Sequence, residues 1–176
     1  MPQPSADAAA HSAALAARIG DEIAGSGGWI SFARYMELAL YAPGLGYYAA
    51  GAAKLGGAGD FVTAPEISPL FGEALADPVA EVLRATGGDV LELGAGSGKL
   101  AADLLGALDR VGSLPGRYLI LEPSPELAQR QRERLAGRLP ALARRIEWIT
   151  ALPDAFTGVV IGNEVLDALP VHRVRV

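Results

Sequence analysis

The middle of the chain contains the run Val90-Leu91-Glu92-Leu93-Gly94-Ala95-Gly96-Ser97-Gly98. Its first residues are mostly apolar and predict a short strand, and its glycines stand directly before a segment with helical periodicity. Glycines allow the backbone to turn sharply and allow a ligand to approach it closely. The run therefore predicts a cofactor-binding loop between a strand and a helix.

Strand-like and helix-like segments alternate around this loop. We expect strands over 89–93, 117–121, 145–149 and 158–162, and helices over 99–108 and 125–139. Such alternation is typical of a doubly wound, parallel α/β sheet with a Rossmann-like topology. Right-handed crossovers would place the four strands in the order 3-2-1-4.

The first part of the chain reads as helical. We expect a helix over 6–24, a second over 32–40 that is capped by Ser31, and a third over 70–85 that starts at Ser68-Pro69. A long loop rich in Gly, Ala and Tyr lies between the second and third helices, at 41–60, and loops of this length are often functional. We therefore divide the chain into a helical region with a covering loop, 1–86, and a sheet-containing region, 87–176.

Composition narrows the class of protein. The chain has 176 residues, a net charge of −5 and no cysteine. The lack of cysteine excludes disulfides, thiolate zinc sites and a cysteine nucleophile, and the two histidines are isolated, so we expect no metal site. The negative charge disfavours broad binding to nucleic acid. No apolar run is long enough to cross a membrane.

Three kinds of cofactor loop compete for the glycine run. A Walker loop is excluded because Leu93 and Leu100 stand where a glycine and a hydroxyl residue belong. A dinucleotide loop is disfavoured because its third glycine would come one residue later than Gly98. The remaining form, acid-x-Gly-x-Gly-x-Gly, resembles the first motif of class I methyltransferases. In that case the cofactor-binding residues are Glu92, Gly94, Gly96 and Gly98, with Glu92 facing the ammonium group of S-adenosyl-L-methionine.

Glu122 is the expected partner of this loop. It ends the second strand of the predicted sheet, 28 residues after Gly94. In doubly wound folds a carboxylate at this place accepts hydrogen bonds from the ribose hydroxyls of a cofactor. The alternative is that the glycines only form a tight turn. That alternative does not explain why an acid ends the second strand.

Longer segments resemble the MidA-like methyltransferases, a family that includes a mitochondrial complex I assembly factor. The similar segments are Gly59–Glu73, the glycine loop, Gly162–Val171 and, more loosely, Tyr35–Tyr48. The resemblance implies an S-adenosyl-L-methionine-dependent enzyme that methylates an arginine of a partner protein, of the respiratory complex I subunit type. It also implies a location in the bacterial cytoplasm or, in a eukaryote, in the mitochondrial matrix. Alternatives are a methyltransferase for another acceptor and a non-catalytic, cofactor-binding assembly factor.

The family also implies a seven-stranded sheet in longer chains, so we expect an incomplete sheet made of strands one to four. The segment His172–Val176 reads as the beginning of a fifth strand. We expect this chain to be a truncated form of the methyltransferase domain.

Glu164 and Asp167 are the candidate catalytic residues, since they follow the fourth strand at the edge where α/β sheets bind ligands. Carboxylates can hold a guanidinium group through paired, charge-assisted hydrogen bonds. The two acids would share a face if this segment is helical. The alternative is that Glu164 marks a helix start and Asp167 is solvated.

Thr63 and Glu66 are further candidates for the cofactor site. Both belong to a proline-containing segment just before the third predicted helix, and either could cover the cofactor or the substrate. Asp60 is a similar case. The alternative is a surface turn without a role in binding.

Overall fold

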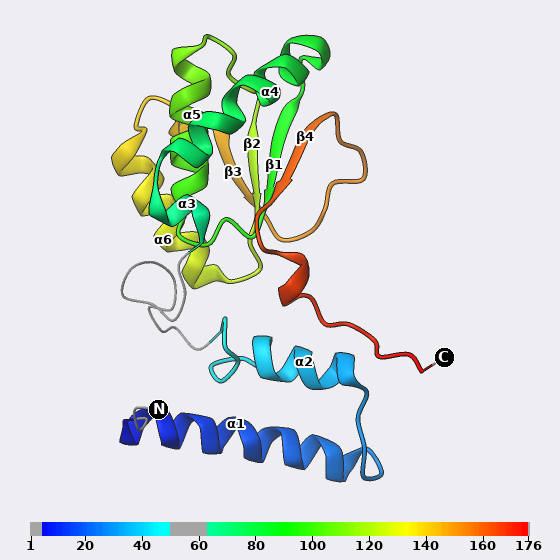
Figure 1. Cartoon of the computed structure of the whole chain (residues 1–176). Coiled ribbons are helices and arrows are strands. Elements are labelled where there is room, and N and C mark those ends of the chain that lie inside the picture. The colour runs from blue at the N-terminus through cyan, green and yellow to red at the C-terminus, as the bar shows by residue number, and fades with distance from the viewer. Residues whose placement is uncertain (1–4, 50–62, 176) are drawn as a thin grey trace. The chain divides into compact units, whose positions relative to one another are not determined.

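The computed structural model describes residues 5–49 and 63–175 of the chain. It divides into two compact units, Met1–Ala52 with Leu166–Val176, and Ala53–Val165. Figure 1 gives the order of the elements along the chain. The division expected at residue 86 does not coincide with these units, because helix α4 (Leu70–Thr86) packs on helix α5 (Lys99–Arg110).

The second unit is built on a four-stranded parallel sheet (Figure 1). Its strands are β1 (Asp89–Leu93), β2 (Tyr118–Leu121), β3 (Ile146–Ile149) and β4 (Gly158–Gly162). Their order, β3-β2-β1-β4, confirms the predicted order. Leu93 pairs with Leu121 on one side and with Gly162 on the other. The segments that follow β1, β2 and β4 therefore start next to one another.

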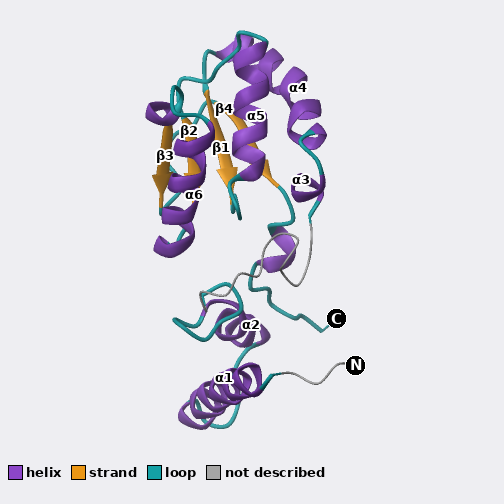
Figure 2. Cartoon of the chain, turned by 90° about the vertical axis from the view of Figure 1, so that its left-hand side faces the viewer, coloured by secondary structure: helices purple, strands orange, loops and turns teal. Residues whose placement is uncertain are grey.

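Helices α4, α5 and α6 (Pro125–Arg138) cover one face of this sheet (Figure 2). The Leu104, Leu105 and Leu108 side chains of α5 are fully buried in the same core as Val90 and Tyr118 of the sheet. Burying each such leucine contributes about 1.5–3 kcal/mol. The packing of α5 in this core therefore stabilises the unit, and it also fixes the loop between β1 and α5.

Local sequence signals set the ends of α4. Gly87 has a left-handed backbone with φ of 62° and caps the C-terminus, where a residue with a side chain would be strained. The Ser68 hydroxyl accepts a hydrogen bond from the Leu70 N–H at 3.1 Å, and the helix begins at Leu70, as the sequence predicted, although Pro69 rather than Ser68 occupies the N-cap position. The short helix α3 (Ala64–Ile67) was not predicted, because its 4 residues are too few to show a period.

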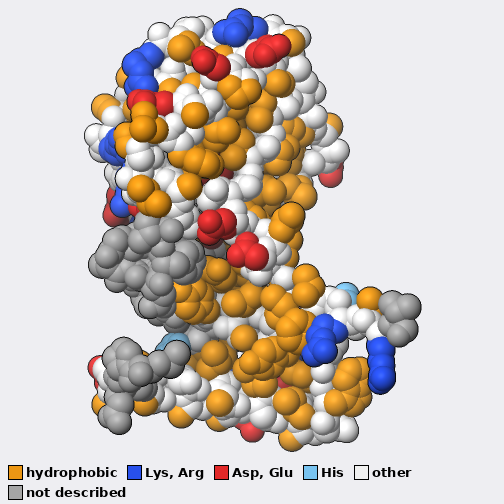
Figure 3. All heavy atoms as spheres, viewed as in Figure 1, with side chains coloured by type: hydrophobic (Ala, Val, Ile, Leu, Met, Phe, Trp, Pro, Cys, Tyr) orange, Lys and Arg blue, Asp and Glu red, His pale blue; other side chains and the backbone are white. Residues whose placement is uncertain are grey.

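The first unit contains α1 (Ala6–Gly25), α2 (Phe32–Tyr41) and the 3-10 helix η2 (Leu166–Ala168). The two α-helices confirm the prediction, and the Ser31 hydroxyl caps α2 by accepting a hydrogen bond from the Arg34 N–H at 3.2 Å. No residue of α1 is buried. Large apolar side chains of this unit, including Trp29, Phe32 and Tyr35, are exposed, and hydrophobic side chains gather on the face of this unit seen in Figure 3. Of the helices in the described part of the chain, none has the length and apolar character to cross a membrane.

The predicted start of a fifth strand near the end of the chain is wrong for the residues that the structure describes. Residues 171–175 have no regular secondary structure. Alternating side chains form a strand only where a neighbouring strand supplies the ladder of hydrogen bonds. This segment belongs to the unit of α2, where the Arg173 guanidinium lies 5.7 Å from the centroid of the Phe32 ring.

Candidate functional site

The loop between β1 and α5 has the open backbone that the glycine run predicts. Gly94, Gly96 and Gly98 all have left-handed conformations, with φ of 62°, 54° and 77°. Residues with side chains are strained in such conformations. Gly94 is exposed and Gly96 is partly exposed, so backbone groups of the loop are accessible to a ligand. The Lys99 ammonium group is bonded to the Asp103 carboxylate at 2.6 Å.

Glu92, two residues before this loop, is buried in the sheet unit. Only 2% of it is exposed, and its Oε2 accepts a hydrogen bond from the Tyr118 hydroxyl at 2.7 Å. Burial raises the pKa of Glu92 to about 7, although the Tyr118 hydrogen bond acts in the opposite direction. Near neutral pH this carboxyl is therefore only partly ionised. Its predicted contact with a cofactor ammonium group stays a prediction.

Glu122 lies directly after β2, beside the glycine loop. It is 7% exposed, its Oε1 accepts a hydrogen bond from the Ser124 N–H at 3.0 Å, and its Oε2 accepts one from the Gln131 amide at 3.1 Å. Burial raises the pKa of Glu122, while these two hydrogen bonds lower it. Each carboxylate oxygen has two lone pairs, so both retain the capacity to accept a further hydrogen bond from a hydroxyl group.

Gln131 on α6 joins the loop to this acid, and sequence reasoning missed it. The side chain is 0% exposed. Its amide also donates a hydrogen bond to the Gly96 carbonyl at 3.0 Å and accepts one from the Trp148 indole N–H at 2.8 Å. The signal that could have found it is its spacing, because Ala128, Gln131 and Leu135 form the buried face of α6. A polar residue on such a face needs hydrogen-bond partners.

Glu66 lies on α3 and contacts the glycine loop directly. Its Oε1 accepts a hydrogen bond from the Ser97 hydroxyl, and the Ser97 oxygen itself accepts one from the Lys99 N–H at 3.2 Å. Thr63 occupies the N-cap position of α3 without a side-chain capping bond. The bond between α3 and the loop favours the interpretation in which Glu66 covers the site. Asp60 lies outside the described residues.

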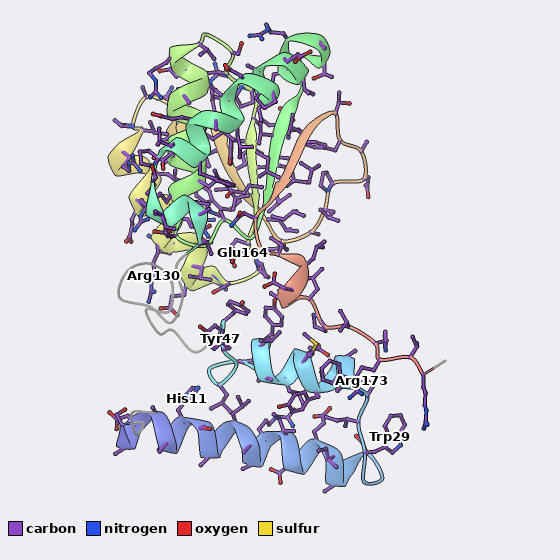
Figure 4. The ribbon with its side chains drawn as sticks, viewed as in Figure 1. His11, Trp29, Tyr47, Arg130, Glu164 and Arg173 are labelled. Atoms are coloured by element: carbon purple, nitrogen blue, oxygen red, sulfur yellow. The ribbon has the colours of Figure 1, made fainter. Side chains whose placement is uncertain are left out.

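Glu164 lies in the turn after β4, where the strands of the sheet end (Figure 4). The turn reaches the glycine loop, since a Cβ built on Gly94 would lie 3.5 Å from Cγ2 of Val165. Glu164 is exposed and has φ of 52°, and it is the one non-glycine residue in the described part of the chain with a positive φ. A left-handed residue with a side chain costs roughly 1–2 kcal/mol. Such strained residues cluster at functional sites.

Asp167 is exposed on η2 and belongs to the other compact unit. Because η2 begins at Leu166 and Glu164 is left-handed, the two acids do not share a helix face. The prediction that Glu164 and Asp167 share a face assumed one helix through both residues, and the structure has no such helix. Their catalytic roles stay predictions.

The carboxyl edge of β1 and β2 thus combines two features that fit the nucleoside part of a cofactor. One is a loop with an accessible, glycine-lined backbone, and the other is the fixed carboxylate of Glu122. Across residues 5–49 and 63–175, no group of three or more His, Cys, Asp or Glu side chains is arranged to hold a metal ion.

Comparisons with known proteins point to one family. Residues 74–176 match the family described as "Putative S-adenosyl-L-methionine-dependent methyltransferase". The zebrafish (Danio rerio) protein arginine methyltransferase NDUFAF7, mitochondrial, is 34% identical over 171 residues, which cover 83% of this chain and 40% of that protein. The human (Homo sapiens) protein of the same name is 33% identical over 174 residues, which cover 84% of this chain and 39% of that protein.

Two solved structures from Burkholderia thailandensis share the fold. One, bound to S-adenosyl-homocysteine, is 56% identical with a TM-score of 0.89, and the match covers 97% of this chain and 45% of that chain. The other, a native crystal structure, is 55% identical with a TM-score of 0.85, and the match covers 98% of this chain and 44% of that chain. The chain therefore spans less than half the length of the relatives and structures that it resembles here.

Proposed function

Because this chain belongs to the S-adenosyl-L-methionine-dependent methyltransferase family matched by residues 74–176, we propose that it forms the cofactor-binding part of an enzyme that methylates an arginine of a partner protein. The observation that carries the proposal is the glycine loop beside the fixed carboxylate of Glu122. The names of the zebrafish and human relatives support arginine as the acceptor. The S-adenosyl-homocysteine in a similar structure supports the cofactor.

In this proposal two sets of residues hold the cofactor. Glu122 accepts hydrogen bonds from the ribose hydroxyls, since both of its oxygens keep a free lone pair. The remaining residues act at the loop: the glycines let the ligand approach the backbone, Glu92 faces the ammonium group, and α3 covers the site. These residues are Gly94, Gly96, Gly98, Glu92, Thr63 and Glu66. When bound, S-adenosyl-L-methionine supplies a methyl group on a sulfonium.

Glu164 orients the acceptor in the proposed reaction, and a role for Asp167 in the same step stays a prediction. Methyl transfer by direct displacement requires alignment of the nucleophile with the methyl carbon more than it requires a strong acid or base. A guanidinium group has donors in a planar fork, and a carboxylate can fix that plane through two parallel hydrogen bonds. Glu164 is exposed, and the turn that carries it places Val165 beside Gly94 of the glycine loop. Both facts favour Glu164 as the residue that meets the acceptor.

The partner in this proposal is a protein, of the respiratory complex subunit type that the family resemblance implies. The relatives carry the word mitochondrial in their names. We propose the mitochondrial matrix for a eukaryotic source and the cytoplasm for a bacterial one.

The cofactor is tested by calorimetry on the full-length protein with S-adenosyl-homocysteine and, in parallel, with NAD. We expect S-adenosyl-homocysteine to bind and NAD not to bind. Binding of NAD alone would reject the methyltransferase assignment of this site.

The acceptor is tested by changing Glu164→Gln, which keeps the size of the side chain and removes its charge. We expect the methylation rate to fall by at least about tenfold, because one charge-assisted hydrogen bond to the guanidinium is worth roughly 1.5–3 kcal/mol. Cofactor affinity should change little. Glu81→Gln, an exposed acid on α4, serves as the matched control.

Mass spectrometry of the methylated partner locates the methyl group. A methyl group on a residue other than arginine would reject the arginine proposal. Cofactor binding without any methyl transfer would favour the assembly-factor alternative.

A further inference from the structure

We infer that Gln131 is a positioning residue that fixes the Glu122 carboxylate and the Gly96 carbonyl relative to each other, and so sets the shape of the cofactor site. This inference rests on the proposed function. It adds a residue on α6 to a site that sequence motifs place only on the loop and at the end of β2.

Gln131 occupies a buried position, where an amide group destabilises the fold unless its hydrogen bonds are formed. It lies on the buried face of α6 between Ala128 and Leu135, and it is 0% exposed. An apolar side chain of similar size would cover the core without the desolvation of an amide. What the amide adds over such a side chain is its set of three hydrogen bonds, to Glu122, Gly96 and Trp148.

These three partners fix one orientation of the amide. The Trp148 indole nitrogen can only donate, so the amide oxygen must face it. The Gly96 carbonyl can only accept, and the ionised Glu122 carboxylate can only accept, so the amide nitrogen must face both. The opposite orientation would lose all three bonds. The Arg132 guanidinium lies 4.7 Å from the centroid of the Trp148 ring and adds a further contact to the indole.

The bond to Glu122 affects both the direction and the charge of that carboxylate. Within the described residues, the groups hydrogen-bonded to it are the Ser124 N–H and the Gln131 amide, neither of which is charged. Burial favours the neutral carboxyl, and these donors favour the ionised form. Loss of the Gln131 donor should therefore raise the pKa of Glu122 further. It should also allow the Glu122 carboxylate to rotate, because Oε2 would no longer be held.

The same side chain supports the glycine loop. Its amide holds the Gly96 carbonyl, and its stem lies under Gly98, where an added Cβ would be 3.5 Å from the Gln131 Cγ. One side chain thus bonds Gly96 of the loop and Glu122, and lies beside Gly98. A change at Gln131 should alter the loop and Glu122 together.

The test is Gln131→Met in the full-length protein, because methionine has a similar length and no hydrogen-bond donors. Affinity for S-adenosyl-homocysteine is measured by calorimetry from acidic to mildly basic pH. We expect affinity to fall about tenfold, the loss typical of one charge-assisted hydrogen bond. In a plot of affinity against pH, we call the fall in affinity at low pH the acidic limb. We also expect this limb to move to higher pH, since Glu122 would be protonated more easily. A merely structural role would lower stability without moving this limb.

Gln129→Met is the matched control. Gln129 lies on the same helix, is exposed, and donates a hydrogen bond to Glu133 at 2.8 Å. This variant should bind S-adenosyl-homocysteine as the unmodified protein does.

Trp148→Phe is the second variant and decides the question if Gln131→Met does not fold. It keeps an aromatic ring in the core and removes the donor that orients the amide. We expect a smaller loss of affinity and the same upward movement of the acidic limb. If each variant that folds keeps both the affinity and the pH profile of the unmodified protein, the inference is overturned while the proposed function stands. If the unmodified protein does not bind S-adenosyl-homocysteine, the proposed function fails and the inference fails with it.

Discussion

The two compact units differ in what they bury. Every polar or charged side chain that is buried in the described part of the chain belongs to the sheet unit, and each has a hydrogen-bond or ion-pair partner: Glu92, Asp103, Ser113, Glu122 and Gln131. In the helical unit α1 buries no residue at all, and Trp29, Phe32 and Tyr35 are exposed.

This difference teaches where binding geometry can be fixed. A buried polar group costs about 1–3 kcal/mol when it lacks a partner, so a bonded network allows only one arrangement of its members. In the sheet unit this network includes Glu122 and the carbonyl of the glycine loop. In the helical unit, polar contacts such as the ion pair between Arg34 and Glu22 at 2.8 Å are exposed or half-exposed, while the buried side chains of Leu38 and Ala42 are apolar. Cofactor affinity should therefore depend on the sheet unit.

The largest effect on cofactor affinity is expected from Gly96→Val, in the sheet unit. Gly96 has φ of 54°, which a β-branched residue adopts only with strain. The added side chain would also enter the space next to the loop backbone. We expect affinity for S-adenosyl-homocysteine to fall more than about 100-fold, equivalent to about 3 kcal/mol, with circular dichroism unchanged. Calorimetry measures the affinity.

Gly112→Val separates backbone strain from the loss of the site. Gly112 also has a left-handed backbone, with φ of 66°, it is exposed, and no atom would lie within 4 Å of an added Cβ. It follows the far end of α5 and is not part of the loop. This variant should lose stability but keep its affinity. Equal loss of affinity in both variants would contradict the assignment of the loop.

The second effect concerns stability. Leu104 is 0% exposed in the core of the sheet unit, while Leu15 on α1 is only half-buried. We expect Leu104→Ala to lower the free energy of unfolding by roughly 3–5 kcal/mol, because it removes buried methyl groups and leaves a cavity. Leu15→Ala should cost about 1 kcal/mol or less, since less apolar surface returns to water. Urea unfolding of both variants measures the difference, and similar losses would show that α1 is packed as tightly as α5.

The sequence predicted the sheet well because its signals are local. A short apolar run marks each strand, residues such as Ser31 and Gly87 mark helix ends, and the right-handed crossover rule supplies the strand order. Glycines at alternate positions and an acid after the second strand located the loop and Glu122. These features depend on residues close together in the chain.

Contacts between distant segments could not be predicted in the same way. Tyr118 bonds Glu92, and Ser97 bonds Glu66, across 26 and 31 positions of the chain. Neither pair leaves a periodic signal. The end of the chain was misread as a strand over the described residues 172–175 for a related reason, since a strand requires a neighbouring strand that the sequence of the segment does not reveal.

The smallest effect is expected from Glu92, on the pH dependence of stability. It tests whether the sheet unit buries a carboxyl that is protonated near neutral pH. Its pKa is raised from 4.5 to about 7, mainly by burial. Between about pH 4.5 and pH 7, Glu92 therefore keeps its proton in the folded state but has released it in the unfolded state. Stability from this residue is therefore complete below about pH 4.5 and is lost as pH rises through about 7.

We expect Glu92→Gln to remove this dependence. Glutamine is neutral at every pH and can still accept the hydrogen bond from Tyr118, as Glu92 does at 2.7 Å. The variant should match the unmodified protein in acid and exceed its free energy of unfolding at mildly basic pH by at most about 3 kcal/mol, the equivalent of the shift in pKa. Urea unfolding at both pH values measures this, and the difference between the two proteins cancels the other titrating groups. The raised pKa of Glu122 acts in the same direction in both proteins. Parallel pH profiles would mean that Glu92 is ionised in the folded state, so that its negative charge would already be present for a cofactor ammonium group.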